Sequence, residues 1–271
     1  MDHQSSFANV LDASWPPSAE DALVISREKA ELVDVVIDVL SATSLPTTSC
    51  AVLVDSQCGR AAAVAAHQAG IGVIAAVERS TASHFDFLYG PDFATRLAHL
   101  QATGAKVKLL NGVAWDNPQG LLGLARLLSL RTWCTAHTVE LLVEIVEPPE
   151  SSPKAATTLT TAQMLYDAGV APDVWKVEPL TRAETIIEIS TAARAGGFTP
   201  ARYVVLGGSL SFDELVPNVE RLASSGAIDG FAVGRALWAG PLMERLTGTQ
   251  TRAGTTKELK DRFRSLLNVF A

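Results

Sequence analysis

Short apolar runs alternate with longer amphipathic stretches along almost the whole chain, and this alternation restricts the fold more than any other feature. Seven β-rich runs cover residues 50–56, 72–78, 105–112, 140–147, 173–179, 202–208 and 230–235, and a less apolar run, SFANVLD, covers 6–12. Strands that alternate with helices are typical of parallel sheets, whose crossover connections need a helix. Eight strands at a spacing of roughly 20 to 35 residues fit a (β/α)8 barrel better than a doubly wound sheet. We therefore expect an α/β protein with a single (β/α)8 TIM barrel, in one domain over residues 1–271.

The stretches between the runs have the pattern of helices. Several of them, such as GRAAAVAAHQAG (59–70) and SFDELVPNVERLASSG (211–226), end at a glycine, as helix C-caps do. Residues 26–42 predict a first barrel helix and residues 256–271 a closing C-terminal helix. The segment PPESSPKAATT (148–158) predicts a loop insertion.

Composition excludes several classes of protein. With 48% hydrophobic residues, 19% charged residues and a net charge of -7, the chain can bury a sizeable core and is not disordered. The acidic balance and the lack of a Lys/Arg run argue against nucleic-acid and anionic-membrane partners, and no apolar run reaches the ~18 residues that span a bilayer.

The cysteines and the N-terminal residues predict a cytoplasmic protein. Three cysteines, an odd number with no CxxC, argue against a disulfide framework or a zinc site. The first residues, MDHQSSFANVLDASWPP, lack the basic and apolar regions of a signal peptide.

Charged and small residues close nearly every apolar run. In a (β/α)8 barrel the active site lies at the C-terminal ends of the strands, where side chains from several strands meet. In chain order, the runs end at Asp12, Asp55, Glu78, Lys108, Glu144, Lys176 with Glu178, Gly207 to Ser209, and Gly234 with Arg235. This ring of charge predicts a substrate site, and the alternative for each member is an ion pair at the barrel rim.

Lys176 is the most unusual residue of this set, because it lies inside the apolar run DVWKVEP. A lysine is almost never fully buried unless it is paired, so it needs a partner or a chemical role. In a barrel lumen, a low dielectric and the neighbouring cation Lys108 would favour the neutral amine, which forms Schiff bases with carbonyls. Glu144, on the strand between these lysines, is placed to shuttle protons. The alternative is a salt bridge from Lys176 to Glu144 or Glu178 without covalent chemistry.

The last two runs are followed by glycine-containing loops that predict a phosphate site. Backbone amides of Gly208, Ser209 and Gly234, with the N-terminus of a short helix, would form the phosphate cradle that is frequent in this fold. The guanidinium of Arg235 matches phosphate geometry. A tight turn is the alternative explanation for the first glycine pair.

Three carboxylates, Asp12, Asp55 and Glu78, are expected to contact the substrate. Asp55 and Glu78 could hold a divalent cation, but no histidine closes a predicted strand. We therefore expect neither a metal nor another cofactor.

The segments PDVWKVEP, VVLGGSLSFDELV and GAIDGFAVGRALW resemble the class I, Schiff-base ketose-phosphate aldolase superfamily, which includes tagatose-1,6-bisphosphate aldolase and sulfofructosephosphate aldolase. They are at least as similar to the 5-dehydro-2-deoxyphosphogluconate aldolase-like (DUF2090) domain. The resemblance covers roughly residues 105–245 and implies a (β/α)8 barrel. It implies that Lys176 is the Schiff-base lysine, Glu144 the proton-transfer acid and Lys108 the assisting lysine.

The same resemblance implies that Gly208, Ser209, Gly234 and Arg235 contact a phosphate. At the first strand the tagatose-bisphosphate relatives resemble DQRGS where this chain has DASWP, so only Asp12 matches. A different or smaller aldehyde half of the substrate is therefore expected.

Three functions are consistent with the sequence. The leading hypothesis is a class I aldolase that cleaves a phosphorylated ketose or keto-sugar acid into a dihydroxyacetone-phosphate-like product and an aldehyde. The second is a metal-independent phosphosugar isomerase or epimerase that uses the carboxylates, with Lys176 as an electrostatic clamp. The third is a catalytically silent barrel that binds a sugar phosphate. All three expect a phosphorylated sugar as partner and leave a homo-oligomer open.

Overall fold

Seven strands form one parallel sheet in the computed structural model, which describes residues 6–79, 82–146, 155–179 and 181–270. In sheet order they are β1 (Ala51–Val54), β2 (Gly72–Ala76), β3 (Gly104–Leu110), β4 (Glu140–Val146), β5 (Val174–Val177), β6 (Arg202–Leu206) and β7 (Gly230–Ala232). Each strand pairs in parallel with the next, so sequence order and spatial order coincide. The seven β-rich runs are therefore confirmed as strands of an α/β fold, whereas the closed eight-stranded barrel stays a prediction.

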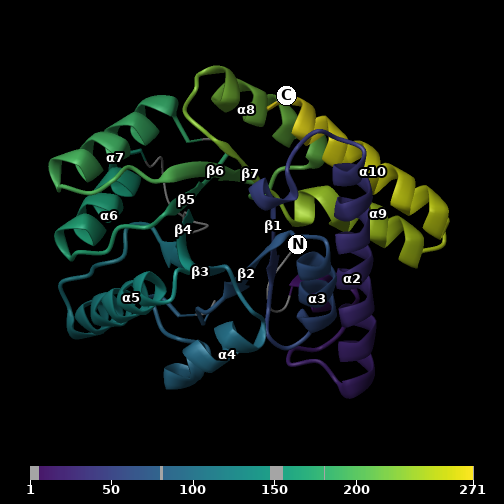
Figure 1. The fold of residues 1–271 in the computed structure, drawn as a ribbon, viewed down its shortest axis with the longest axis horizontal. Helices are drawn as coiled ribbons and strands as arrows, with labels where there is room; N and C mark the ends of the chain where they lie inside the picture. Colours follow the sequence, from purple (N-terminus) through teal and green to yellow (C-terminus); the bar gives the residue numbers. More distant parts are fainter. Residues whose placement is uncertain (1–5, 80–81, 147–154, 180, 271) are drawn as a thin grey trace.

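Helices surround the curled sheet (Figure 1). Those that follow the strands are α3 (Arg60–Gln68), α4 (Phe93–His99), α5 (Pro118–Ala136), α6 (Ala155–Asp167), α7 (Ala183–Ala195), α8 (Phe212–Ser224) and α9 (Arg235–Leu246), with short 3-10 turns η1 (Thr47–Ser49) and η2 (Gly90–Asp92). The predicted first and closing helices are confirmed as α2 (Ala19–Ser41) and α10 (Arg252–Asn268). Most of the predicted loop insertion over 148–158 lies outside the described residues, and its last positions belong to α6. In the described part of the chain, no helix has the length and apolar character to span a bilayer.

The prediction of a strand over residues 6–12 is wrong, because this segment forms the short helix α1 (Ser6–Val10). The backbone N–H of Leu11 donates to the carbonyl of Phe7, a helical i to i+4 spacing. Phe7 is buried and its ring stacks on Trp238 of α9, with 4.0 Å between the ring centroids. The apolar residues of this segment thus pack between helices instead of adding to a sheet.

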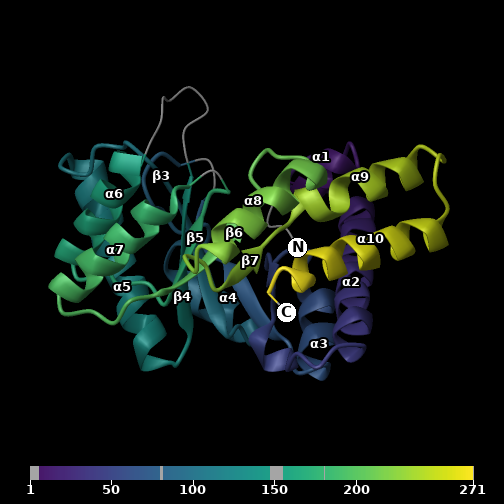
Figure 2. The same ribbon diagram turned by 90° about the horizontal axis from the view of Figure 1, so that it is seen from above.

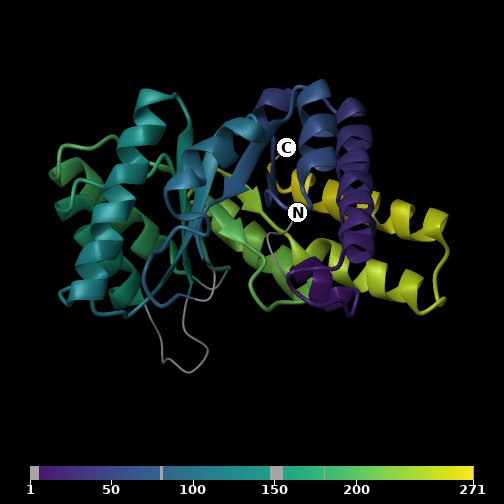
Figure 3. The same ribbon diagram turned by 90° about the horizontal axis from the view of Figure 1, so that it is seen from below.

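The N-terminal and C-terminal helices pack together in a second apolar cluster beside the sheet. Figure 2 shows α1 next to α9, and Figure 3 shows the purple N-terminal helices against the yellow C-terminal ones. The buried members of this cluster are Phe7, Ala8, Ile25, Val35, Cys58, Trp238, Leu242 and Leu259. They connect α1, α2, α9 and α10 with the loop after β1.

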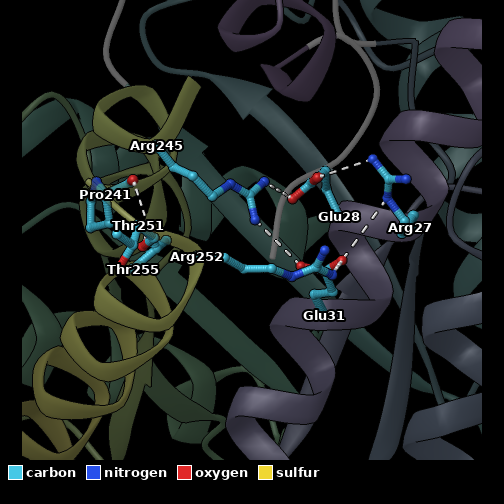
Figure 4. Close-up of polar contacts among 8 residues, drawn as sticks. All are labelled: Arg27, Glu28, Glu31, Pro241, Arg245, Thr251, Arg252 and Thr255. Carbon is cyan, nitrogen blue, oxygen red and sulfur yellow. Dashed lines mark hydrogen bonds and ion pairs between the residues drawn. The ribbon is translucent and has the colours of Figure 1, made fainter. Parts of the chain in front are cut away.

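Ion pairs fasten α2 to α9 and to the start of α10 (Figure 4). Arg245 of α9 pairs with Glu28 and, at 3.4 Å, with Glu31, both on α2. Arg252 pairs with Glu31, and Arg27 lies 3.8 Å from Glu28 and 4.0 Å from Glu31. Because Glu28 and Glu31 each meet more than one guanidinium, this network fixes the contact between the two ends of the chain.

Candidate active site

The charged side chains of β3, β4 and β5 meet on the inner face of the sheet. Lys106 Nζ lies 2.8 Å from Glu78 Oε1 and 2.5 Å from Glu144 Oε2. The other oxygen of Glu144 accepts a hydrogen bond from Lys176 Nζ at 3.1 Å. Glu78, Lys106, Glu144 and Lys176, which we call the charged row, therefore form a continuous series of alternating charges, and all four are buried.

Strand alternation explains why Lys176 points inward. Successive side chains of a strand lie on opposite faces, so Lys176 and its neighbour Trp175 point in opposite directions. Trp175 packs on the helix layer, where its indole N–H donates to the hydroxyl of Tyr166 of α6 at 2.9 Å. Lys176 is consequently placed on the face that carries Glu144, its in-register neighbour on β4. The structure brings Lys176 and Glu144 together in the ion pair that the sequence analysis gave as the alternative to covalent chemistry, and the Schiff-base and proton-transfer roles stay predictions.

Lys106 is completely buried and remains a cation. Burial lowers its pKa, but the adjacent carboxylates of Glu144 and Glu78 outweigh burial and raise the pKa above its ordinary value. A buried ammonium with a carboxylate on either side gains enough Coulomb energy to offset its desolvation. Lys106 therefore supplies a fixed positive charge next to Glu144.

Lys108, which the sequence analysis gave as the assisting lysine, is partly buried. It lies two residues closer to the C-terminal end of β3 than Lys106. It lies beside Glu144 in the β3–β4 register. Burial lowers the pKa of Lys108, and the charge of Lys106 lowers it further, against the opposing effect of Glu78 and Glu144. Two lysines of β3 thus face the same carboxylate region, and Lys106 forms an ion pair with Glu144.

Asp55 lies at the end of β1 but is engaged by the protein itself. It forms a buried ion pair with Lys29 of α2. Its Oδ1 accepts the backbone N–H groups of Gln57 at 2.8 Å and Cys58 at 2.7 Å. Asp55 therefore holds the loop that leads into α3, and its proposed contact with a substrate stays a prediction.

The predicted phosphate residues lie in two adjacent loops after β6 and β7. Ser209 is exposed and Gly208 partly exposed in the first loop, while Gly234 precedes α9 and Arg235 is its exposed first residue. A Cβ on Gly207 would lie only 3.2 Å from the Cβ of Ala236, so glycine at this position lets the loop after β6 approach the start of α9 closely. The contact of these residues with phosphate stays a prediction.

The two helix N-termini at these loops differ in their capping. Ser211 and Glu214 form a capping box at the start of α8, so the chain satisfies those N–H groups itself. No side chain caps α9 at Gly234. The start of α9 is therefore the better anion site of the two.

Asp12 is exposed in the turn after α1 and does not end a strand. The expected first member of the predicted ring is therefore not at a strand end, and the charged residue that contacts Asp55 at the end of β1 is Lys29 of α2. Asp12 as a substrate contact stays a prediction, without the strand that motivated it.

Two buried lysines that pair with predicted site carboxylates, Lys29 and Lys106, were missed by the sequence analysis, although each leaves a signal. Lys106 lies two residues before Lys108, so strand alternation places both on one face. Lys29 is spaced four residues from Ile25 and Val33, in the buried stripe of α2. A charged residue inside an apolar stripe predicts a buried partner.

The other candidate sites in the described residues offer fewer side chains that could bind a ligand or react with it. No three His, Cys, Asp or Glu side chains converge on a point that could hold a metal ion within the part of the chain that the structure describes. A groove of about 400 Å³ lies between the start of α8 and α10. Its charged side chains pair with one another, as in Lys257 with Asp261 and Arg262 with Glu258. The charged row is therefore the candidate active site.

Solved structures with a similar fold include several aldolases. A Schiff base forming fructose-1,6-bisphosphate aldolase is 13% identical with a TM-score of 0.57, and the match covers 98% of this chain and 90% of that one. An archaeal fructose 1,6-bisphosphate aldolase is 14% identical with a TM-score of 0.56, covering 99% and 90%. Cgl0159 from Corynebacterium glutamicum is 13% identical with a TM-score of 0.54, covering 88% and 76%. At these identities the similarity is one of fold.

The sequence comparisons give a family but no individual relative. No curated protein matches the chain by sequence. One family model matches all of residues 1–271, and this confirms the resemblance to the DUF2090 domain. The chain belongs to the family described as "Uncharacterized protein conserved in bacteria (DUF2090)".

Proposed function

We propose that this protein is a class I aldolase that cleaves a phosphorylated ketose or keto-sugar acid through a Schiff base on Lys176. The observation that carries the proposal is the contact between Lys176 Nζ and Glu144 Oε1, 3.1 Å apart near the C-terminal ends of the strands. An amine that reacts with a carbonyl needs a neighbouring group to take and return its proton. Glu144 lies at hydrogen-bond distance from this amine, and the aldolases of similar fold make the same class of reaction a natural candidate.

The first half of the reaction forms the iminium ion. Lys176 transfers a proton to Glu144, and the neutral amine adds to the ketone carbon of the substrate to give a carbinolamine. Glu144 then donates this proton to the carbinolamine hydroxyl, which leaves as water. The result is a positively charged iminium at Lys176 and a carboxylate at Glu144, so the charge of the pair is unchanged.

The second half breaks the carbon–carbon bond. The Glu144 carboxylate accepts the proton of the substrate hydroxyl two carbons away from the iminium carbon. As that hydroxyl becomes an aldehyde, the bond breaks and its electron pair moves to the iminium, which becomes a neutral enamine. Glu144 returns the proton to the enamine carbon, and water then hydrolyses the new iminium to release the ketone product.

The phosphate of the substrate would lie at the start of α9. The uncapped N–H groups after Gly234, together with Arg235 and the Gly208–Ser209 loop, offer donors to a phosphate group. The strands that lead to these loops, β6 and β7, come directly after β5 in the sheet, so the phosphate would be held beside the lysine strand.

The test is reductive trapping. Sodium borohydride reduces an iminium to a stable secondary amine, which adds the mass of the ketone, less water, plus two hydrogens. We expect an adduct on Lys176 after incubation with dihydroxyacetone phosphate or another ketose phosphate, located by peptide mass spectrometry. A full panel of keto-sugar phosphates that leaves the intact mass unchanged would refute the proposal.

Two variants control this experiment. Lys176→Met should abolish the adduct, because it removes the amine and keeps an unbranched side chain of similar length. Lys257→Met should keep it, because Lys257 is an exposed lysine of α10 that pairs with Asp261. An adduct that persists in Lys176→Met would assign the chemistry to another lysine.

A second candidate function is a phosphosugar isomerase or epimerase without a covalent intermediate. It is favoured by the ion pair itself, in which Lys176 acts as a charged clamp, and by the second buried carboxylate, Glu78, on the same row. This function predicts turnover of a sugar phosphate that survives borohydride treatment.

A further inference from the structure

Glu78 is a buried carboxylate at the far end of the charged row. It lies two residues after β2, and its Oε1 accepts a hydrogen bond from Lys106 Nζ at 2.8 Å. Lys106 Nζ is also 2.5 Å from Glu144 Oε2, while Glu144 Oε1 is 3.1 Å from Lys176 Nζ. Glu78 is therefore connected to the proposed reactive lysine through two intervening charged groups.

Lys106 couples the two carboxylates because it stays charged. Its side chain has no exposed surface, and the two flanking carboxylates keep its pKa raised despite burial. An ammonium that donates hydrogen bonds to two carboxylates divides its donors between them and cannot take the position that is best for one alone. The presence of Glu78 therefore weakens the ion pair between Lys106 and Glu144.

We propose that Glu78 is a positioning residue that acts through Lys106 on the Glu144–Lys176 pair. By taking a share of the ammonium of Lys106, Glu78 leaves Glu144 able to accept and return the proton of Lys176. Glu78 also fixes the position of Lys106 Nζ, which in turn fixes the carboxylate plane of Glu144. The consequence for catalysis rests on the proposed aldolase function, whereas the consequence for the amine of Lys176 does not.

The charges around Lys176 make the effect of each substitution predictable in sign. On the side of β3 and β4, the charged groups of this region are Glu78, Lys106, Lys108 and Glu144, and Glu178 follows Lys176 by two residues. On the other side, the in-register positions on β6 and β7 are Val204 and Gly230, which carry no charge. Glu140 and Arg202 pair with each other at the first residues of β4 and β6. Removing a negative charge from this group favours the neutral amine, and removing a positive charge favours the ammonium.

Glu78→Gln and Lys106→Met should therefore change Lys176 in opposite directions. In Glu78→Gln, Lys106 pairs with Glu144 alone. Lys176 therefore loses a nearby negative charge, and its ion pair with Glu144 becomes weaker. In Lys106→Met, Glu144 no longer pairs with Lys106, so its ion pair with Lys176 becomes stronger. Lys176 also loses a nearby positive charge. The double variant lacks the residue through which Glu78 acts, so it should label like Lys106→Met. A role in packing alone gives no reason for opposite signs.

The measurement is the reactivity of Lys176 toward trace acetic anhydride as a function of pH, with the exposed Lys257 as the internal reference. Only the neutral amine reacts, so the pH midpoint of labelling reports its protonation. We expect the midpoint to fall by about one pH unit in Glu78→Gln and to rise by about one unit in Lys106→Met, a tenfold change in reactivity below the midpoint in each case. Equal midpoints, or shifts of the same sign, would overturn the proposal.

Two further variants keep the test decisive if Glu78→Gln fails to fold, as judged by circular dichroism. Glu78→Asp keeps the charge and should label like the native protein. The comparison of Lys106→Met with the double variant tests whether Glu78 acts through Lys106, because both proteins lack that lysine. Their midpoints should agree, and a double variant with a clearly lower midpoint would show a direct effect of the Glu78 charge on Lys176 and overturn the proposal.

The catalytic readout separates this proposal from the proposed function. If the aldolase reaction holds, Glu78→Gln should still form the borohydride-trapped adduct, but kcat for cleavage should fall by about 10- to 100-fold with little change in KM, because Glu144 no longer exchanges its proton freely. No adduct in the native protein together with opposite midpoint shifts would refute the aldolase and keep the role of Glu78. An adduct without those shifts would do the reverse.

Discussion

Replacing Lys29 by methionine is expected to destabilise the protein by about 3–5 kcal/mol. Lys29 of α2 has no exposed surface, and its partner Asp55 is 2% exposed. The substitution leaves a carboxylate in the interior without its counter-ion, and removing one member of a buried ion pair is costly for this reason. The ammonium also lies 5.3 Å from the ring centroid of Phe7, a cation–π contact that adds about 1 kcal/mol.

Hydrogen bonds from the backbone to Asp55 place the expected loss of stability in Lys29→Met toward the lower part of this range. Asp55 keeps two hydrogen bonds from the N–H groups of Gln57 and Cys58, which partly stabilise its charge. The double variant Lys29→Met/Asp55→Asn removes the unpaired charge and keeps an oxygen for both N–H groups. It should regain about 2 kcal/mol relative to Lys29→Met, since a buried pair replaced as a whole costs far less than a broken one.

The assay is urea unfolding followed by circular dichroism, with the free energy of unfolding extrapolated to water for all three proteins. Domains are stable by about 5–15 kcal/mol, so the single substitution should move the midpoint visibly. A loss of less than about 1 kcal/mol in Lys29→Met, or a double variant no more stable than the single one, would refute the idea that α2 supplies a necessary buried counter-charge.

Three further predictions follow from close contacts and burial. Gly59→Ala should cost about 1–3 kcal/mol of unfolding free energy in the same assay, because its Cβ would lie 2.3 Å from the carbonyl oxygen of Asp55; an unchanged midpoint would contradict this. Tyr166→Phe should cost about 1–3 kcal/mol, since it leaves the buried indole N–H of Trp175 without its acceptor, and a cost near zero would argue against that hydrogen bond. Burial raises the pKa of Cys134 from 9.0 to about 12, so the native thiol keeps a proton that the unfolded chain releases and stability should fall as pH rises between these values. Iodoacetamide should accordingly label Cys134 at pH 9 only in urea, and rapid labelling of the native protein would contradict its burial.

Much of the sheet could be predicted because its strands have a strong local pattern. The run around Trp175 and Lys176 is short, β-branched and bounded by Pro172 and Pro179, and the structure confirms a strand inside it. Parallel order followed from the helical stretches between the runs. The meeting of Lys176 with Glu144 followed as well, because residues at corresponding positions of neighbouring parallel strands lie side by side.

The segment around Phe7 could not be predicted in the same way. A short apolar run satisfies both a strand and one turn of helix, and what decides between them is the surface it meets. Here that surface is the ring of Trp238, more than 200 residues further along the chain, on a helix that the run alone does not specify.

The sequence by itself determined that this chain has buried charges at the ends of parallel strands, because local periodicity places each charged residue on a strand and near its end. Only the tertiary structure decided which charges pair: Lys106 with Glu78 and Glu144, and Lys29 with Asp55. The physical reason is that an ion pair depends on the distance and direction between two side chains on different elements. Strand register and the position of α2 beside the end of β1 set those quantities, and neither can be read from the residues of one segment.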